Sequence, residues 1–148
     1  MTGDEVTPKT LRVNPLATDE STLIKTLTAQ GVDLEKIPFL DYGYRIISSP
    51  FSLGASIEYL LGHYFLQETA SQLPAQLLAP SGEDNVLDMA SAPGGKTTQM
   101  AAYMGNGGVI TAVDVNRLRL YALENNLERM GVRNTVVYNM DSLDLPDE

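Results

Sequence analysis

The feature that most constrains this chain is a strand, a tight turn of small residues and a helix start, which follow one another within residues 86–97. The sequence there reads VLDMASAPGGKT. The apolar residues predict a buried strand, and the run of Ala, Ser, Pro and Gly predicts a turn whose backbone a ligand can approach closely. The helix that follows directs unpaired N–H groups and the positive end of its dipole at this turn. The stretch therefore predicts a site for an anionic small molecule.

After residue 85 the pattern indicates two consecutive β-α-β units. Residues 108–114 and 135–141 read as further strands, and residues 96–104 and 116–130 read as the helices that connect them. Short β-α-β connections specify a parallel, doubly wound sheet. We therefore expect an α/β fold of the Rossmann-like type, of which this chain contains the first three parallel strands.

The part of the chain before residue 66 predicts a small α+β region. Strands are expected at Thr10–Asn14, Ile37–Leu40 and Tyr44–Ile47, and a helix is expected after Asp19 or Ser21. Met1–Pro8 reads as a loose leader. We divide the chain into a small α+β N-terminal region, residues 1–65, and the first half of a Rossmann-like domain, residues 66–148.

The segment that joins these two parts is expected to be helical. Residues 54–66 read as helical without a clear period, and residues 67–78 place apolar residues at helical spacing. Pro74 lacks an N–H group, so it is expected to kink the second helix or to divide it. Residues 80–84 read as a loop.

The composition excludes several kinds of site. The chain has no cysteine and a single histidine, His63, so disulfides, cysteine-ligated metals and a metal site built on histidine are not expected. The lack of cysteine also fits a cytoplasmic protein. The formal net charge is −9, so no basic surface for nucleic acid is visible in the chain as a whole. The longest apolar segment, Phe51–Leu66, is too polar to span a membrane.

Three carboxylates follow the three predicted strands: Asp88, Asp114 and Asp141, spaced by 26 and 27 residues. Parallel strands end at one edge of a sheet, so we expect these side chains along the edge where open α/β sheets bind ligands. Asp114 can accept from both hydroxyls of a ribose. Asp141 can accept from a purine amine or cap the following loop. The alternative is that all three residues cap turns and helices.

Two cations and a second motif lie near this predicted edge. Lys96 opposes the dipole at a helix start, so it serves an anionic ligand group or is a solvated surface residue. Arg119 reaches the ligand edge or pairs with a carboxylate. Gly95-Lys96-Thr97 also suggests a phosphate loop, but Ala90 stands where that motif needs glycine and Pro93 removes a backbone donor. A phosphate-loop nucleotide-binding protein is therefore the weaker alternative.

The segment Asp88–Thr97 closely resembles the cofactor motif of the Sun/Nop (NSUN-type) RNA cytosine-5 methyltransferases. The compact N-terminal region, residues 1–65, resembles archaeal members of the family and is expected on the RNA side. The similarity extends to Asp114-Val115-Asn116 and to Thr10–Asn14, which looks like the family's N-terminal strand. It also covers Tyr64–Ser71, which looks like the helix leading into the fold. The resemblance implies a class I methyltransferase fold, S-adenosyl-L-methionine as the cofactor, and tRNA or rRNA as the substrate.

The resemblance also implies roles for individual residues. It places the methionine moiety of the cofactor on the turn, the ribose hydroxyls on Asp114 and the adenine amine on Asp141, with Asp88 behind the site. Arg119 lies downstream in the same motif and is included among the cofactor-binding candidates. The expected cofactor-binding residues are Ala90, Ser91, Ala92, Pro93, Gly94, Gly95, Lys96, Asp114, Arg119 and Asp141.

The catalytic groups of the family are missing from the sequence. By resemblance, one cysteine thiolate attacks carbon 6 of cytosine and a second cysteine helps to release the product, whereas this chain has no cysteine. We therefore assign no catalytic residue and expect the chain alone to be inactive. A missing C-terminal half, or a complementary chain, is expected to complete the sheet. The alternative is a non-catalytic or split-enzyme module that binds S-adenosylmethionine or RNA.

Overall fold

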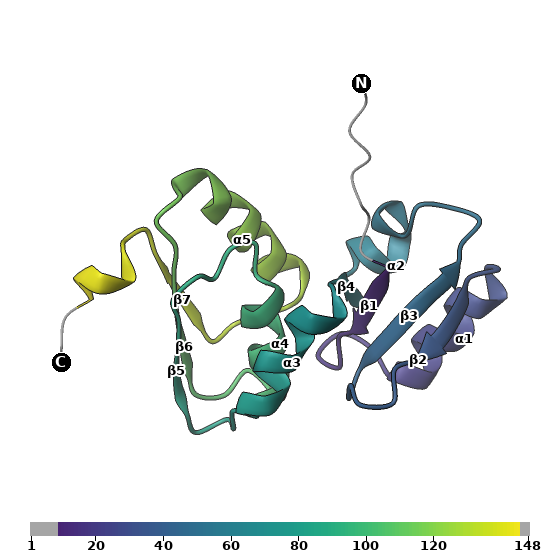
Figure 1. The fold of residues 1–148 in the computed structure, drawn as a ribbon, viewed down its shortest axis with the longest axis horizontal. Coiled ribbons are helices and arrows are strands. Elements are labelled where there is room, and N and C mark those ends of the chain that lie inside the picture. The colour runs from purple at the N-terminus through teal and green to yellow at the C-terminus, as the bar shows by residue number, and fades with distance from the viewer. Residues whose placement is uncertain (1–8, 146–148) are drawn as a thin grey trace.

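The computed structural model describes residues 9–145, and the leader expected at residues 1–8 lies outside them. These residues form a four-stranded sheet followed by a three-stranded sheet, each with its own helices (Figure 1). No helix among residues 9–145 combines the length and the apolar character needed to cross a bilayer. The first part contains β1 (Thr10–Val13), α1 (Glu20–Ala29), β2 (Asp33–Lys36), β3 (Gly43–Ser48), the 3-10 turn η1 (Leu53–Ala55), α2 (Ile57–Leu60) and β4 (Tyr64–Leu66). The second part contains α3 (Thr69–Leu78), β5 (Asn85–Asp88), α4 (Gly95–Tyr103), β6 (Val109–Val113), α5 (Arg117–Arg129), β7 (Thr135–Tyr138) and the 3-10 turn η2 (Ser142–Asp144).

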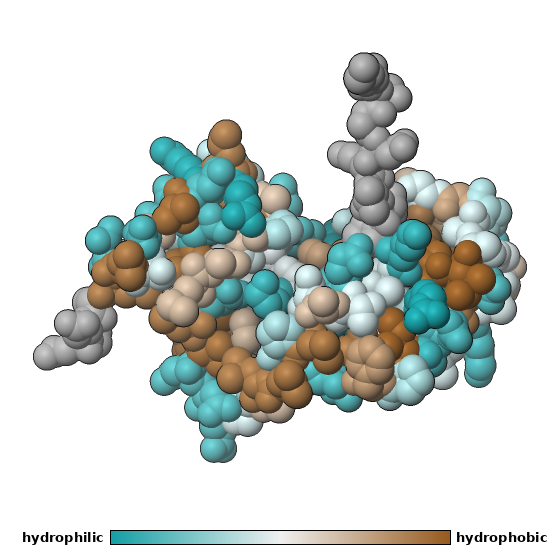
Figure 2. Space-filling view, viewed as in Figure 1, coloured by the Kyte–Doolittle hydropathy of each residue, from teal (hydrophilic) through white to brown (hydrophobic). Residues whose placement is uncertain are grey.

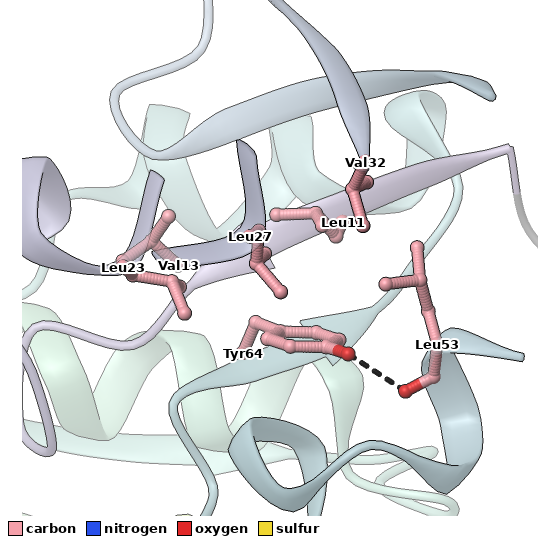
Figure 3. Packing of buried hydrophobic residues seen from close by; sticks show 7 residues of the cluster. All are labelled: Leu11, Val13, Leu23, Leu27, Val32, Leu53 and Tyr64. Atoms are coloured by element: carbon pink, nitrogen blue, oxygen red, sulfur yellow. Dashed lines mark hydrogen bonds between the residues drawn. The ribbon is translucent and has the colours of Figure 1, made fainter. Parts of the chain in front are cut away.

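The first sheet is antiparallel, with strand order β2-β3-β1-β4, so β1 is a central strand. The expected strand at residues 10–14 and the expected helix after Asp19 are confirmed, and Asp19 caps α1 by accepting from Thr22 N at 3.0 Å. One face of the sheet packs on α1. Figure 3 shows the core there, in which the Tyr64 hydroxyl donates to the Leu53 carbonyl at 2.7 Å. The residues of this core are Leu11, Val13, Leu23, Leu27, Val32, Leu53 and Tyr64.

Two predictions for the first part are wrong. The strand expected at Ile37–Leu40 lies at Asp33–Lys36 instead, and residues 37–42 form the connection to β3. Pro38 has no N–H group to donate to a neighbouring strand. The apolar side chains of Ile37 and Leu40 are instead buried in that connection.

The helix expected at residues 54–66 is also largely wrong. Only Ile57–Leu60 is α-helical, after the short turn η1, and Tyr64–Leu66 is a strand that pairs with β1. The helix expected from the resemblance over Tyr64–Ser71 begins at Thr69. Gly62 ends the helical segment with a φ of +73°, and the apolar run after it supplies the edge strand. The expected boundary between residues 65 and 66 falls within this strand.

The second sheet is parallel, with strand order β5-β6-β7, and α4 and α5 connect its strands. The predicted α/β fold with three parallel strands is therefore confirmed. Helices α3, α4 and α5 lie on the same side of the sheet (Figure 1) and pack on Val86, Ile110, Ala112 and Val137. The expected break at Pro74 is absent from α3, which continues through this residue as one helix.

The opposite face of this sheet is open in the part of the chain that the structure describes. Four apolar side chains on it are exposed by 42–49%: Leu87, Val109, Val136 and Tyr138. We call these four residues the open face. A hollow of about 540 Å³ lies against it, and β5 has β6 as its single partner among residues 9–145. Figure 2 shows hydrophobic residues gathered around β5 and the end of α3, where Leu77 and Leu78 are also exposed.

Candidate functional site

The turn between β5 and α4 is fastened to the end of the neighbouring strand β6. The backbone N–H and the hydroxyl of Ser91 both donate to the Val113 carbonyl, at 3.1 and 3.0 Å. The next backbone N–H, that of Ala92, donates to Asp114 Oδ2 at 3.3 Å. The turn therefore lies across the carboxyl edge of the sheet, as the sequence predicted.

Asp88 shapes the turn from behind. Its Oδ2 accepts from the Thr97 hydroxyl at 2.7 Å, and its Oδ1 accepts from the Ala90 N–H at 3.3 Å. Both Asp88 and Thr97 are buried, so their contact is shielded from water. Asp88 thus joins the start of the turn to the first turn of α4.

The two glycines of the turn accommodate the protein's own packing. Gly94 has a φ of +108°, and a Cβ there would lie 3.1 Å from Leu123 Cδ1. A Cβ on Gly95 would lie 3.3 Å from the side chain of Gln67. A side chain would therefore be strained and crowded at Gly94, and crowded at Gly95. The exposed positions of the turn are Ala90 and Pro93.

Asp114 is the charged centre of the site. Its side chain is buried, its Oδ1 accepts from the Asn116 N–H at 2.9 Å, and its Oδ2 lies 3.3 Å from Arg119 Nη1. Arg119 also donates through Nη2 to the Ala92 carbonyl. The two expectations for Arg119, a carboxylate partner and a place at the ligand edge, are therefore met together. Arg119 ties Asp114 to the turn.

Asp141 lies apart from this group. Strand β7 ends at Tyr138, three residues earlier than predicted, and Asp141 is exposed. Its Oδ1 accepts from the Leu143 N–H at 3.0 Å, so it caps η2. No hydrogen bond or ion pair among the described residues joins Asp141 to the turn or to Asp114. The capping role considered for Asp141 in the sequence is observed.

A hollow of about 200 Å³ lies beside the turn, between Ser91–Pro93 and the segment Phe65–Glu68. The half-buried side chain of Lys96 and the side chain of Glu68 both line it, and in residues 9–145 Lys96 makes no ion pair. Small-molecule pockets usually hold about 300–1,000 Å³. The hollow is thus large enough for one end of a cofactor, and it offers both a cation and a carboxylate.

Asn126 and Asn139, which the sequence did not indicate, also support the turn. Asn126 of α5 donates to the Pro93 carbonyl at 2.9 Å, and Asn139 donates to the Asp114 carbonyl at 2.9 Å. Neither residue belongs to a short motif, so the local sequence carried no signal for them. Across the described part of the chain, His, Asp and Glu side chains form no group of three that could hold a metal ion.

Comparison with known proteins gives a consistent family. Residues 75–148 match the family model described as 16S rRNA methyltransferase RsmB/F. The Schizosaccharomyces pombe protein named 25S rRNA (cytosine-C(5))-methyltransferase nop2 is 44% identical over 95% of this chain and 23% of its own length. The Homo sapiens protein named 28S rRNA (cytosine(4447)-C(5))-methyltransferase is 43% identical over 94% of this chain and 17% of its own length.

Among solved structures, a methyltransferase homolog protein from Pyrococcus horikoshii matches both parts of the fold. The TM-score is 0.88 with 38% identity, over 93% of this chain and 45% of that chain. The chain spans 17–23% of the length of these two curated relatives and less than half of this solved neighbour.

Proposed function

Because this chain belongs to the RsmB/F family of rRNA methyltransferases, we propose that it forms the cofactor-holding part of an S-adenosylmethionine-dependent RNA cytosine-5 methyltransferase. The observation that carries the proposal is the group formed by Ala92, Asp114 and Arg119 at the carboxyl edge of the sheet. It places a buried carboxylate beside an accessible turn, where open α/β sheets bind nucleosides.

In this proposal the cofactor lies across the edge formed by β5 and β6. Asp114 accepts from the ribose hydroxyls, Arg119 holds Asp114 against the turn, and Asp141 accepts from the adenine amine. The turn, residues 90–96, holds the methionine moiety. When bound, S-adenosylmethionine supplies a methyl group made electrophilic by the sulfonium to which it is attached.

The hollow beside the turn fits one end of this cofactor. The methionine moiety carries an ammonium and a carboxylate, and the hollow presents Glu68 and Lys96. Lys96 lies in the first turn of α4, whose N–H groups and dipole also favour an anionic group. A cation together with a carboxylate suits a zwitterion better than a triphosphate. This supports the methyltransferase proposal over the phosphate-loop alternative.

The open face supports the proposal that a further segment of the same protein completes the sheet. A parallel sheet is normally covered on both faces, and an unpaired strand edge is a template for another strand. Leu87 lies on the edge strand β5, and Val136 and Tyr138 lie on the edge strand β7, so the apolar open face extends between two strand edges. More than half of the Pyrococcus neighbour lies outside its match to this chain, which is enough length for the missing strands and helices.

The RNA substrate is proposed from the names of the relatives, since the described surface gives limited support. Two cations of the first sheet are paired with carboxylates: Lys36 with Glu20 at 2.6 Å and Arg45 with Glu35 at 3.2 Å. Together with a net charge of −9, this leaves little positive charge for phosphates. We therefore propose that most phosphate contacts, like the catalytic cysteines, belong to the segment that completes the sheet.

The test is calorimetric titration with S-adenosylhomocysteine, in a protein that includes the completing segment. Asp114→Ala should abolish detectable binding, because it removes the proposed ribose acceptor and releases Arg119. Asp84→Ala is the matched control, because Asp84 caps the loop at the amino end of the same sheet by accepting from Ser81 N at 2.6 Å. Unchanged affinity in Asp114→Ala, with a normal unfolding curve, would overturn the assignment.

A further inference from the structure

Within residues 9–145, Arg12 is a buried cation whose hydrogen-bond partners include no carboxylate. It lies on the central strand β1 and is 2% exposed. Its Nη1 donates to the Gly95 carbonyl at 2.6 Å, to Gln67 Oε1 at 2.8 Å and to Gln99 Oε1 at 3.2 Å. Its Nη2 donates to the Thr98 hydroxyl at 2.8 Å. The guanidinium therefore spans from the first sheet to the first turn of α4.

Charge alone does not account for this placement. A cation next to a helix N-terminus opposes the helix dipole, and burial of an unpaired charge is costly. Burial lowers the pKa of Arg12 to about 9, which still leaves the guanidinium charged at neutral pH. The hydrogen bonds of Arg12 supply the favourable contribution to its burial, because a planar guanidinium can donate to several fixed acceptors at once.

The acceptors around Arg12 are held in place by one another. The amide group of Gln67 donates to the Ser71 carbonyl at 2.9 Å, and that of Gln99 donates to the Gln72 carbonyl at 2.9 Å. Each amide nitrogen is thus engaged elsewhere, which leaves both amide oxygens turned toward Arg12.

Gly95 completes the contact between the two parts of the molecule. The space where its Cβ would lie is occupied by the side chain of Gln67, at 3.3 Å. The second glycine of the turn therefore allows the first part of the chain to approach α4 closely enough for Arg12 to reach the Gly95 carbonyl.

We propose that Arg12 is a positioning residue, through which the N-terminal antiparallel sheet fixes the start of α4 and thereby the turn at residues 90–95. The N-terminal sheet is then a structural part of the site and not a separable module. The consequence for cofactor affinity rests on the proposed function, whereas the positioning of the turn does not.

Asn14 provides a matched control two residues further along the same segment. It is 1% exposed and also ties the first part of the chain to the second, because its Nδ2 donates to the Gly62 and Met130 carbonyls at 2.8 and 2.9 Å. It has no hydrogen bond to the turn. Loss of Asn14 therefore loosens the same interface at the end of α5 instead of the start of α4.

The first experiment is amide hydrogen exchange on this chain, with its fold checked by circular dichroism. Arg12→Met should speed exchange of the hydrogen-bonded amides of Ser91 and Thr98 by about tenfold or more, because the start of α4 loses its anchor. Arg12→Lys keeps the charge but not the planar guanidinium, so it should increase the exchange rate of both amides to an intermediate value. It replaces Arg12→Met as the test if Arg12→Met does not fold. Asn14→Ala should leave both amides at the wild-type rate.

The second experiment measures affinity for S-adenosylhomocysteine in a protein that includes the completing segment. Arg12→Met should weaken binding by about tenfold and Asn14→Ala should not. Wild-type exchange at Ser91 and Thr98 in both Arg12 variants, or equal acceleration in Asn14→Ala, overturns the proposal. If the wild-type protein fails to bind, the proposed function fails, and the exchange result still decides whether Arg12 positions the turn.

Discussion

Gly94 gives the turn its shape through a backbone conformation that other residues rarely adopt. Its φ is +108°, and an added Cβ would lie 3.1 Å from Leu123 Cδ1. We expect Gly94→Ala to lower the free energy of unfolding by about 2 kcal/mol, since strain and crowding add. Urea unfolding of the wild-type chain and of the Gly94→Ala variant measures the difference in the free energy of unfolding.

Gly105→Ala separates these two causes. Gly105 also has a positive φ, +58°, but apart from its chain neighbours no atom of residues 9–145 lies within 4 Å of the place of its Cβ. Its substitution should therefore cost only the conformational strain, about 1 kcal/mol. Equal losses in the two variants would show that Leu123 yields and that the turn tolerates a side chain.

Single residues also differ in how far the sequence could predict their positions. Ser91 and Gly94 belong to one short motif and Asp114 ends the next predicted strand, so local pattern was enough to place them at the carboxyl edge. Arg12 was missed because a charged residue between Leu11 and Val13 reads as the solvent side of an alternating strand. Its burial depends on α4, more than eighty residues later in the chain, and no local pattern contains that information.

At the scale of elements, the β-α-β half was predictable and the first half only partly so. Strands β5, β6 and β7 alternate with helices whose ends are marked in the sequence. The hydrophobic period and these boundary residues therefore predict the same elements. In the first half the strand β4 has three residues, and the pairing that stabilises it comes from β1. Partners distant in the sequence therefore decided those elements, against local helical preference.

The open face yields a prediction from two adjacent residues of β7. Val136 is on the open face, and Val137 packs against the core on the helical side of the sheet. Val136→Lys should change the free energy of unfolding by less than about 0.5 kcal/mol, whereas Val137→Lys should lower it by about 2 kcal/mol. Urea unfolding of this chain measures both.

The same pair reports on the role of the open face. Val136→Lys should also reduce self-association in sedimentation, because it places a charge on the apolar surface. If Val136→Lys lowers the free energy of unfolding as much as Val137→Lys does, the face is not exposed in this chain. In a protein that includes the completing segment, Val136→Lys should instead be destabilising, since the face is then buried.

At the scale of the whole molecule, two guanidinium groups, one from each half, hold the halves together. Arg12 reaches from the first sheet to α4, and Arg129 reaches from α5 to the Tyr59 and Tyr64 carbonyls at 2.6 and 3.2 Å. Arg129 also lies 4.0 Å from the centre of the Tyr59 ring. Each of these hydrogen bonds joins a guanidinium of one half to a backbone carbonyl of the other, so they fix the relative position of the halves.

The proposed cofactor site can be present in this chain without the groups that the proposed reaction needs. Attack on cytosine requires a thiolate in the family that this chain resembles, and the 148 residues contain no cysteine. Hydroxyl groups are far weaker nucleophiles at neutral pH, and a lone His63 has no partner thiol to activate. We therefore expect this chain alone to transfer no methyl group to RNA.

The measurement is transfer of labelled methyl groups from S-adenosylmethionine to unmodified rRNA, followed by nucleoside analysis for 5-methylcytosine. The chain alone should match the reaction without protein, and a protein that also carries the completing segment should give labelled product. In that longer protein, Asp114→Ala should return the signal to background because the proposed cofactor site is lost. Labelled 5-methylcytosine formed by the 148 residues alone would mean that the thiolate requirement does not hold here, and that the nucleophile must be sought within this chain.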